Sequence, residues 1–126
     1  MMEPLPRLVL VVEDVIAEQR LMMALLQRAG YKVVGQPSAE AAWAWLETHG
    51  APALAVVDIG LPGENGLELC RRIRAHPDWH NLPVVICSCR DREADQFWAK
   101  RQGATDYLTK PYTPQQLLSM VQRYVR

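Results

Sequence analysis

The 126-residue sequence lacks an excess of charge of either sign, because 14 Lys and Arg residues balance 14 Asp and Glu residues. A protein that neutralises many nucleic-acid phosphates needs a strongly basic surface. No apolar run approaches the roughly 20 residues that cross a membrane, and Met1 to Pro6 hold no apolar stretch typical of a secretion signal. We therefore expect a cytoplasmic protein that binds neither nucleic acid nor membrane.

Cysteine is scarce as well, with residues only at positions 70, 87 and 89. Cys87 and Cys89 are separated by one residue, which prevents an ordinary disulfide between them within one strand. The odd number and this spacing favour free thiols in a reducing compartment. The Cys-x-Cys pair also lacks the second pair or histidine cluster that would complete a tetrahedral metal site.

The length is typical of one compact domain, which buries roughly two-thirds of its unfolded surface without disulfides. Apolar runs of strand length alternate with longer segments of helical period, a pattern that predicts repeated βαβ units and a parallel sheet. We expect a single domain over residues 1–126, with a core at about 8–125. The expected strands are Leu8–Val12, Lys32–Gly35, Leu54–Val57, Val84–Cys87 and Tyr107–Thr109.

Helix start signals lie between these strands. Ser38 and Asn65 are expected caps of the second and third helices, and the fourth helix is expected at about 93–102. The fifth helix has a capping-box pattern, with Thr113 as the cap and Pro114 at the first helical position. The apolar positions that recur at helical spacing are Leu21, Leu25 and Leu26, then Ala41, Ala42, Trp45 and Leu46, then Leu69 and Ile73, and finally Leu117, Leu118, Val121 and Val125.

Polar residues lie where the expected strands end, which is where open parallel sheets bind ligands. These residues are Glu13 and Asp14 after the first strand, Asp58 after the third, Ser88 after the fourth and Lys110 after the fifth. Singly, most of them have an ordinary interpretation as helix caps or solvated surface groups. Asp58 is harder to explain in that way, because it ends a continuous apolar run. Together they form a much stronger signal of a functional site.

The acidic trio Glu13, Asp14 and Asp58 needs compensation. Two carboxylates about 4 Å apart repel by roughly 4 kcal/mol at an effective dielectric constant of about 20. Such a group therefore requires a cation or raised pKa values. Hard oxygen ligands without a dense cage favour Mg²⁺ that retains several waters over Ca²⁺ or Zn²⁺, so the sequence predicts a magnesium site.

At this point the sequence resembles the response regulator receiver family from Leu8 to Val125. The resemblance is carried by segments 11–14 (VVED), 58–66 (DIGLPGENG), 83–88 (PVVICS) and 103–111 (GATDYLTKP). It implies an α/β fold, a doubly wound (βα)5 flavodoxin-like three-layer sandwich with a parallel sheet of order 2-1-3-4-5.

The resemblance also implies roles for the matched residues. Asp58 corresponds to the phosphoacceptor, a carboxylate nucleophile that attacks a phosphohistidine in line with the departing imidazole. Lys110 would neutralise one phosphoryl oxygen and Ser88 would hydrogen-bond another. The implied magnesium ligands are Asp14, Asp58, the carbonyl of Gly60, and Glu13 through water.

Tyr107 corresponds to a switch residue whose ring turns from an exposed to a buried position when Ser88 moves toward the phosphate. An ordinary half-buried strand aromatic is the alternative interpretation of Tyr107. The Lys110-Pro111 bond is expected to be cis, as in the family. Gly60 and Arg90 depart from the commonest residues at two positions that influence water access to the acyl phosphate in this family.

The family implies two kinds of protein partner. A sensor histidine kinase or histidine phosphotransfer protein would supply the phosphoryl group, and a downstream effector would bind the face of the fourth helix, fifth strand and fifth helix. We expect a monomer or weak dimer, with no enzyme activity beyond self-phosphorylation and autodephosphorylation at Asp58. The residues on the expected effector face are Arg92, Trp98, Lys100, Arg101, Tyr107 and Gln115.

Other interpretations remain beside this one. Because the chain ends directly after the last expected helix, we expect a stand-alone receiver; the alternative is a receiver excised from a longer response regulator or a hybrid histidine kinase. An aspartyl-nucleophile phosphatase usually has a second aspartate where this chain has Gly60. A receiver-like scaffold that is never phosphorylated would usually lack Asp14, Asp58 or Lys110. A flavodoxin-like cofactor domain would need a phosphate-binding loop where this chain has residues 13–15.

Overall fold

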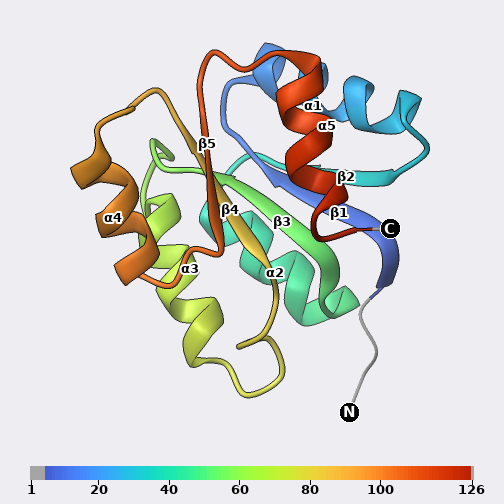
Figure 1. Cartoon of the computed structure of the whole chain (residues 1–126). Coiled ribbons are helices and arrows are strands. Elements are labelled where there is room, and N and C mark those ends of the chain that lie inside the picture. The colour runs from blue at the N-terminus through green and yellow to red at the C-terminus, as the bar shows by residue number, and fades with distance from the viewer. Residues whose placement is uncertain (1–4, 126) are drawn as a thin grey trace.

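A computed structural model describes residues 5–125 as a parallel five-stranded sheet between two layers of helices (Figure 1). The strands are β1 (Leu5–Val12), β2 (Lys32–Gln36), β3 (Pro52–Asp58), β4 (Val84–Ser88) and β5 (Asp106–Thr109). The helices are α1 (Ile16–Arg28), α2 (Ala39–His49), α3 (Gly66–Ala75), α4 (Glu93–Arg101) and α5 (Pro114–Gln122). Each expected strand and helix is therefore present, with ends that differ by a few residues.

The strand order is β2-β1-β3-β4-β5, and all neighbouring pairs are parallel. This confirms the predicted order 2-1-3-4-5. The chain runs outward from β1 to β2 and then returns past β1 to β3, so the order reverses between β1 and β3. Val12 pairs with Val57 at that point, which sets the residues that follow β1 beside the end of β3.

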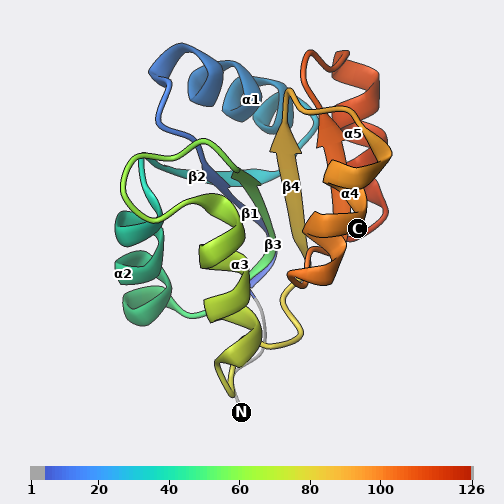
Figure 2. The same cartoon turned by 90° about the vertical axis from the view of Figure 1, so that its left-hand side faces the viewer.

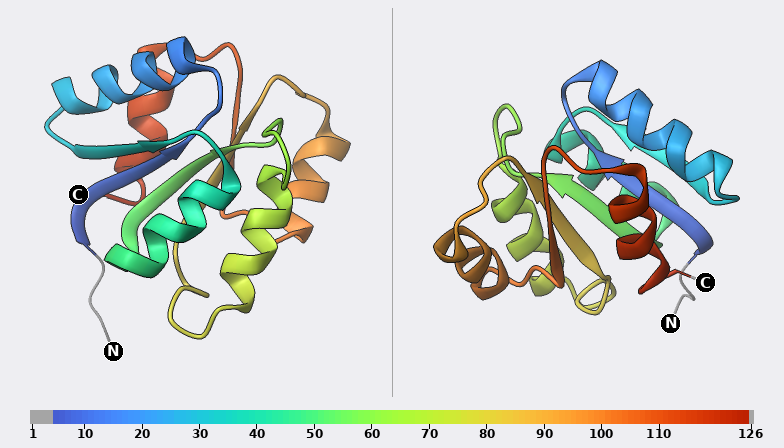
Figure 3. Two further views of the ribbon diagram at one scale, coloured as in Figure 1. Left: turned by 180° about the vertical axis from the view of Figure 1, so that it is seen from behind. Right: turned by 45° about the horizontal axis from the view of Figure 1, so that its top comes forward.

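Helices α1 and α5 cover one face of the sheet, and α2, α3 and α4 cover the other (Figures 2 and 3). Successive side chains of β1 pack alternately against the helices on one face of the sheet and on the other. Leu10 and Val12 pack in the cluster with α2 and α3, whereas Val9 and Val11 pack in the cluster with α1 and α5. This two-sided burial explains the continuous apolar runs, because both faces of each central strand exclude water.

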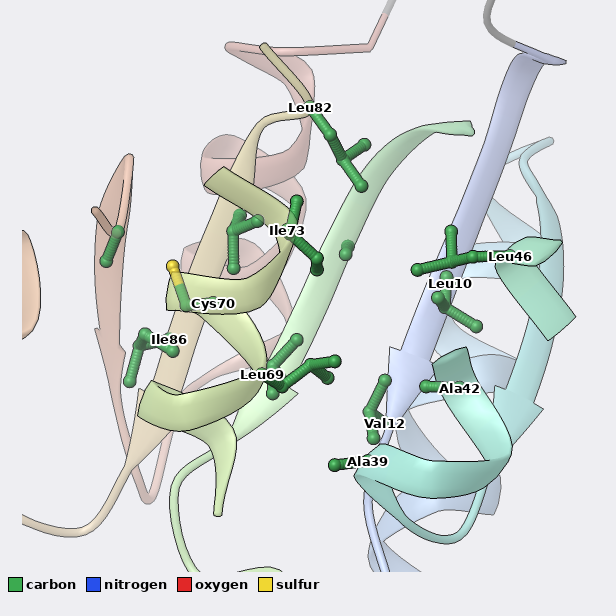
Figure 4. Close-up of a cluster of buried hydrophobic side chains, with 14 of the residues drawn as sticks. Leu10, Val12, Ala39, Ala42, Leu46, Leu69, Cys70, Ile73, Leu82 and Ile86 are labelled. Carbon is green, nitrogen blue, oxygen red and sulfur yellow. The ribbon is translucent and has the colours of Figure 1, made fainter. Parts of the chain in front are cut away.

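The layer of α2 and α3 is drawn in Figure 4. Ala42 and Leu46 of α2 point toward Leu10 and Val12 of β1, and Ile73 of α3 points toward the sheet beside them. Complete burial of such an aliphatic side chain contributes roughly 1.5–3 kcal/mol. The clusters on the two faces therefore hold the sheet between its helices.

The predicted helix caps are confirmed. Ser38 Oγ accepts a hydrogen bond from the Ala41 amide at 3.0 Å, and both Asn65 and Thr113 form complete capping boxes. In α1, however, Met22 and Leu26 are buried, whereas Leu21 is 56% exposed. No helix within residues 5–125 is long and apolar enough to cross a membrane.

Candidate phosphoacceptor site

The three predicted carboxylates meet at the carboxyl end of the sheet. Each of Glu13, Asp14 and Asp58 offers an oxygen atom, and these atoms all lie within 4.8 Å of one another. Glu13 and Asp14 directly follow β1, and Asp58 is the last residue of the adjacent strand β3. The topology therefore brings together side chains that lie far apart in the sequence, in a group with the hard oxygen donors that Mg²⁺ prefers.

Lys110 supplies the positive charge inside this acidic group. Its Nζ lies 2.6 Å from Glu13 Oε1, 2.9 Å from Glu18 Oε1 and 3.5 Å from Asp58 Oδ2. Burial alone would lower the pKa of Lys110, but the hydrogen bonds to Glu13 and Glu18 outweigh burial and raise the pKa well above its ordinary value. The side chain is therefore a permanent cation at neutral pH.

Glu18 was not predicted from the sequence as a member of this group. It lies in the first turn of α1, where an acidic residue is ordinarily explained by the helix dipole. The sequence feature that could have indicated Glu18 was its position four residues after Asp14, at the same end of the sheet. Its contact with Lys110 joins residues 92 positions apart, and local sequence patterns do not report such a contact.

Glu13 is held firmly by the start of α1. Its Oε2 atom accepts a hydrogen bond from the Val15 amide at 3.2 Å, and its backbone carbonyl accepts one from Gln19 Nε2 at 3.0 Å. Burial raises the pKa of the Glu13 carboxyl group, and the bonds from Lys110 and Val15 lower it by less. Its orientation is thus set by α1 as well as by Lys110.

The surroundings of Asp58 depend on Gly66. The Gly66 amide donates to the Ile59 carbonyl at 3.1 Å, so the first residue of α3 lies against the end of β3. A Cβ atom on Gly66 would lie 2.1 Å from the Asp58 carbonyl oxygen. Only glycine allows α3 to start so close to the end of β3.

Cys87 pairs with Asp58 across β3 and β4 and is almost completely buried. Burial raises the pKa of its thiol to about 12, so the thiol stays protonated at neutral pH. Cys70 and Cys87 are buried free thiols, and Cys89 is an exposed one.

Ser88 and Tyr107 are linked through the backbone of Arg90. Ser88 Oγ accepts a hydrogen bond from the Arg90 amide at 3.2 Å, and the Tyr107 hydroxyl donates to the Arg90 carbonyl at 2.7 Å. Tyr107 is only 7% exposed. The structure therefore does not have this ring in the expected exposed position. The ring is turned inward, where its hydroxyl donates to the Arg90 carbonyl.

The last predicted features are the cis bond and Gly60. The Lys110-Pro111 peptide bond is cis, as expected. Gly60 is exposed, and the nearest atom that an added Cβ would meet is Asp58 Oδ2 at 4.0 Å. The space between Gly60 and the Asp58 carboxylate is thus open to solvent.

A fold of this topology with carboxylates, a lysine and a hydroxyl at one end defines a receiver-type α/β domain. The response regulator receiver domain family matches residues 9–122 of this chain. The chain belongs to that family, whose members act in two-component signal transduction.

Individual relatives agree with this assignment. Protein PilH of Pseudomonas aeruginosa is 34% identical over 113 residues, which cover 90% of this chain and 93% of PilH. The chemotaxis response regulator CheY4 of Vibrio cholerae has a TM-score of 0.88 and 26% identity, covering 96% of this chain and 100% of CheY4. The transcriptional regulatory protein PhoP of Escherichia coli K12 is 35% identical over 118 residues, but this chain spans only 52% of its length.

Proposed function

We propose that the chain is a phosphoacceptor receiver that takes a phosphoryl group onto Asp58 and thereby changes a protein-binding surface. The observation that carries this proposal is the convergence of Asp58 with Glu13, Asp14 and Lys110 at one end of the sheet. Asp58 is a partly exposed carboxylate with a cation 3.5 Å away, which suits a nucleophile that must meet a negatively charged phosphoryl group.

In the proposed reaction an Asp58 carboxylate oxygen bonds to phosphorus while the bond from phosphorus to the imidazole nitrogen of a phosphohistidine breaks. The departing imidazole takes up a proton. Lys110 neutralises one phosphoryl oxygen, and the Ser88 hydroxyl donates to another. Mg²⁺, when bound, would offset the negative charge on the phosphoryl and carboxylate oxygens. Its protein ligands would be Asp14, Asp58, the Gly60 carbonyl and, through water, Glu13.

The phosphoryl donor would be a sensor histidine kinase or a histidine phosphotransfer protein in the cytoplasm. The chain would have no enzyme activity beyond self-phosphorylation and autodephosphorylation at Asp58, and it would be a monomer or weak dimer. The similarity to PilH and CheY4 over nearly their whole lengths supports a single receiver domain as the functional unit.

The proposed output surface is the face of α4, β5 and α5. Phe97 and Trp98 are 63% and 57% exposed on α4, and exposed aromatic groups are common anchors of protein interfaces. A groove of about 600 Å³ lies between β5 and α5. Tyr107 lines this groove and also bonds to the Arg90 carbonyl, so this residue connects the surface to the loop that follows Ser88.

The test is labelling by acetyl phosphate with and without Mg²⁺, followed by intact-mass measurement. Wild-type protein should gain one phosphoryl group in a magnesium-dependent reaction, whereas Asp58→Asn should gain none. Asp91→Asn is the matched control, because Asp91 is an exposed carboxylate in the loop between β4 and α4, outside the acidic trio. Equal labelling of wild type and Asp58→Asn would contradict the assignment of the acceptor.

A further inference from the structure

Lys110 is shared among three carboxylates, although its ammonium group has three N–H donors. Two of the contacts, to Glu13 and Glu18, are hydrogen bonds of 2.6 and 2.9 Å. The third, to Asp58 at 3.5 Å, is an ion pair only. The lysine is therefore directed mainly at the two glutamates rather than at the proposed acceptor.

Glu18 differs from the other two partners of Lys110. Its side chain is 46% exposed, compared with 6% for Glu13 and 14% for Asp58. It also lies on a helix rather than at a strand end, and it is outside the acidic trio. An exposed ion pair contributes little to stability because water competes for both charges, so Glu18 can release the lysine at small cost.

We propose that Glu18 is a positioning residue that competes with the phosphoryl group on Asp58 for Lys110. This inference rests on the proposed function. A phosphoryl group adds oxygen atoms that need an N–H donor from Lys110. Glu13 is held in place by the Val15 amide and the start of α1, so the exposed Glu18 is the partner that gives way.

The competition has a direct consequence for affinity. Replacing the Glu18 carboxylate with an amide leaves an acceptor of the same size but removes the charge that attracts Lys110. The ammonium group is then more available to a phosphoryl oxygen. We expect Glu18→Gln to bind a phosphoryl mimic more tightly by about two- to fivefold, the range that corresponds to an exposed ion pair.

A purely structural role for Glu18 predicts a different result. An acidic residue in a first helical turn stabilises the helix through its dipole, and Glu93 likewise lies in the first turn of α4. Helix α4 follows β4, so Glu93 also lies after a strand end of the sheet. Among residues 5–125, the carboxylates within ion-pair distance of Lys110 are those of Glu13, Glu18 and Asp58. Glu93→Gln is therefore the matched control for the loss of one first-turn charge.

The experiment is a titration with beryllofluoride in the presence of Mg²⁺, followed by amide NMR. Wild type, Glu18→Gln, Glu18→Asp and Glu93→Gln are compared. Glu18→Gln should lower the dissociation constant by about two- to fivefold, whereas Glu93→Gln should leave it unchanged. Glu18→Asp keeps the charge and should return the constant toward the wild-type value.

The possible failures are distinguishable. If the wild type binds beryllofluoride and Glu18→Gln binds it equally or more weakly, the competition is overturned while the proposed function stands. If Glu18→Gln and Glu93→Gln lower the dissociation constant for beryllofluoride equally, the effect comes from the loss of one negative charge anywhere on the protein. That result would also overturn the role of Glu18. If the wild type shows no binding at all, the proposed function fails and this inference fails with it.

Discussion

Two glycines near Asp58 have opposite surroundings. An added Cβ on Gly66 would lie 2.1 Å from the backbone carbonyl oxygen of Asp58, a contact that no side-chain rotation can relieve. An added Cβ on Gly60 would approach nothing nearer than Asp58 Oδ2 at 4.0 Å. The first glycine is required by the fold, whereas the second leaves room at the site.

We predict that Gly66→Ala destabilises the protein by roughly 3 kcal/mol, because α3 must move away from the end of β3. Gly60→Ala should change stability by less than about 0.5 kcal/mol. Urea unfolding followed by circular dichroism measures both free energies of unfolding. A stability of Gly66→Ala close to that of the wild type would show that the start of α3 can shift without cost.

At the scale of elements, Arg74 joins α3 to the loops before β4 and β5. Its guanidinium group donates to the carbonyls of Leu82 at 2.6 Å and Gly103 at 2.8 Å, and to Thr105 Oγ1 at 3.0 Å. Thr105 Oγ1 in turn accepts from the Val84 amide, the first residue of β4. One side chain thus satisfies polar groups of two loops at the end of the sheet remote from Asp58.

Arg74→Ala should therefore cost about 2–3 kcal/mol of stability, because it leaves partly buried carbonyls without a charged donor. The matched control is Arg71→Ala, which loses a single exposed bond to Gln102 and should cost less than about 0.5 kcal/mol. Thermal and urea unfolding of the two variants measure the difference. Equal losses would mean that surrounding water replaces the contacts of Arg74.

Strand β5 is coupled to Ser88 through Arg90. The Arg90 amide donates to Ser88 Oγ, and the Arg90 carbonyl accepts from the Tyr107 hydroxyl. A displacement of Ser88 therefore reaches a residue of the groove between β5 and α5 through two hydrogen bonds. This connection requires no unfolding, only a shift between two arrangements of the loop.

We predict that beryllofluoride shifts the amide NMR signals of residues 88–92 and 105–110, with effects that extend onto α4. Tyr107→Ala should confine the shifts to the acidic site while labelling of Asp58 by acetyl phosphate continues. Tyr107→Phe separates the two parts of the side chain, since it keeps the ring and loses the hydroxyl, with its bond to the Arg90 carbonyl and its interaction with Ser88. If Tyr107→Ala leaves the shifts on α4 unchanged, the coupling runs through other residues.

At the scale of the whole molecule, repulsion among the carboxylates at one end of the sheet lowers the free energy of unfolding. Three carboxylates lie within 4.8 Å of one another, and Lys110 offsets only part of their charge. A cation that binds only the folded state stabilises it by mass action. The response to Mg²⁺ therefore reports on the acidic trio as a unit.

Magnesium at roughly tenfold above its dissociation constant should stabilise the wild type by about 1.4 kcal/mol, which raises Tm by about 5 °C. Chelation with EDTA should reverse the shift. Asp14→Ala should lose most of it, and Asp91→Ala should retain it. The absence of any shift in the wild type at millimolar Mg²⁺ would count against the trio as a metal site.

The sequence by itself determined the elements and the residues at the strand ends. Strand positions follow from local apolar runs, and helix starts follow from caps such as Ser38 and Asn65, so both can be read without knowledge of the fold. The rule that parallel strands place their carboxyl ends together then predicts the neighbourhood of Asp58 and Lys110. The distances among these residues agree with that prediction.

The tertiary structure alone decided the partners of these side chains. Glu18 meets Lys110 because α1 packs across the sheet at one particular angle, and Tyr107 is inward because the Arg90 carbonyl is within reach of its hydroxyl. Arg74 likewise binds loops that it approaches only after α3 has packed. Such contacts depend on the mutual orientation of packed layers, which side-chain volumes across the whole core determine and no local pattern encodes.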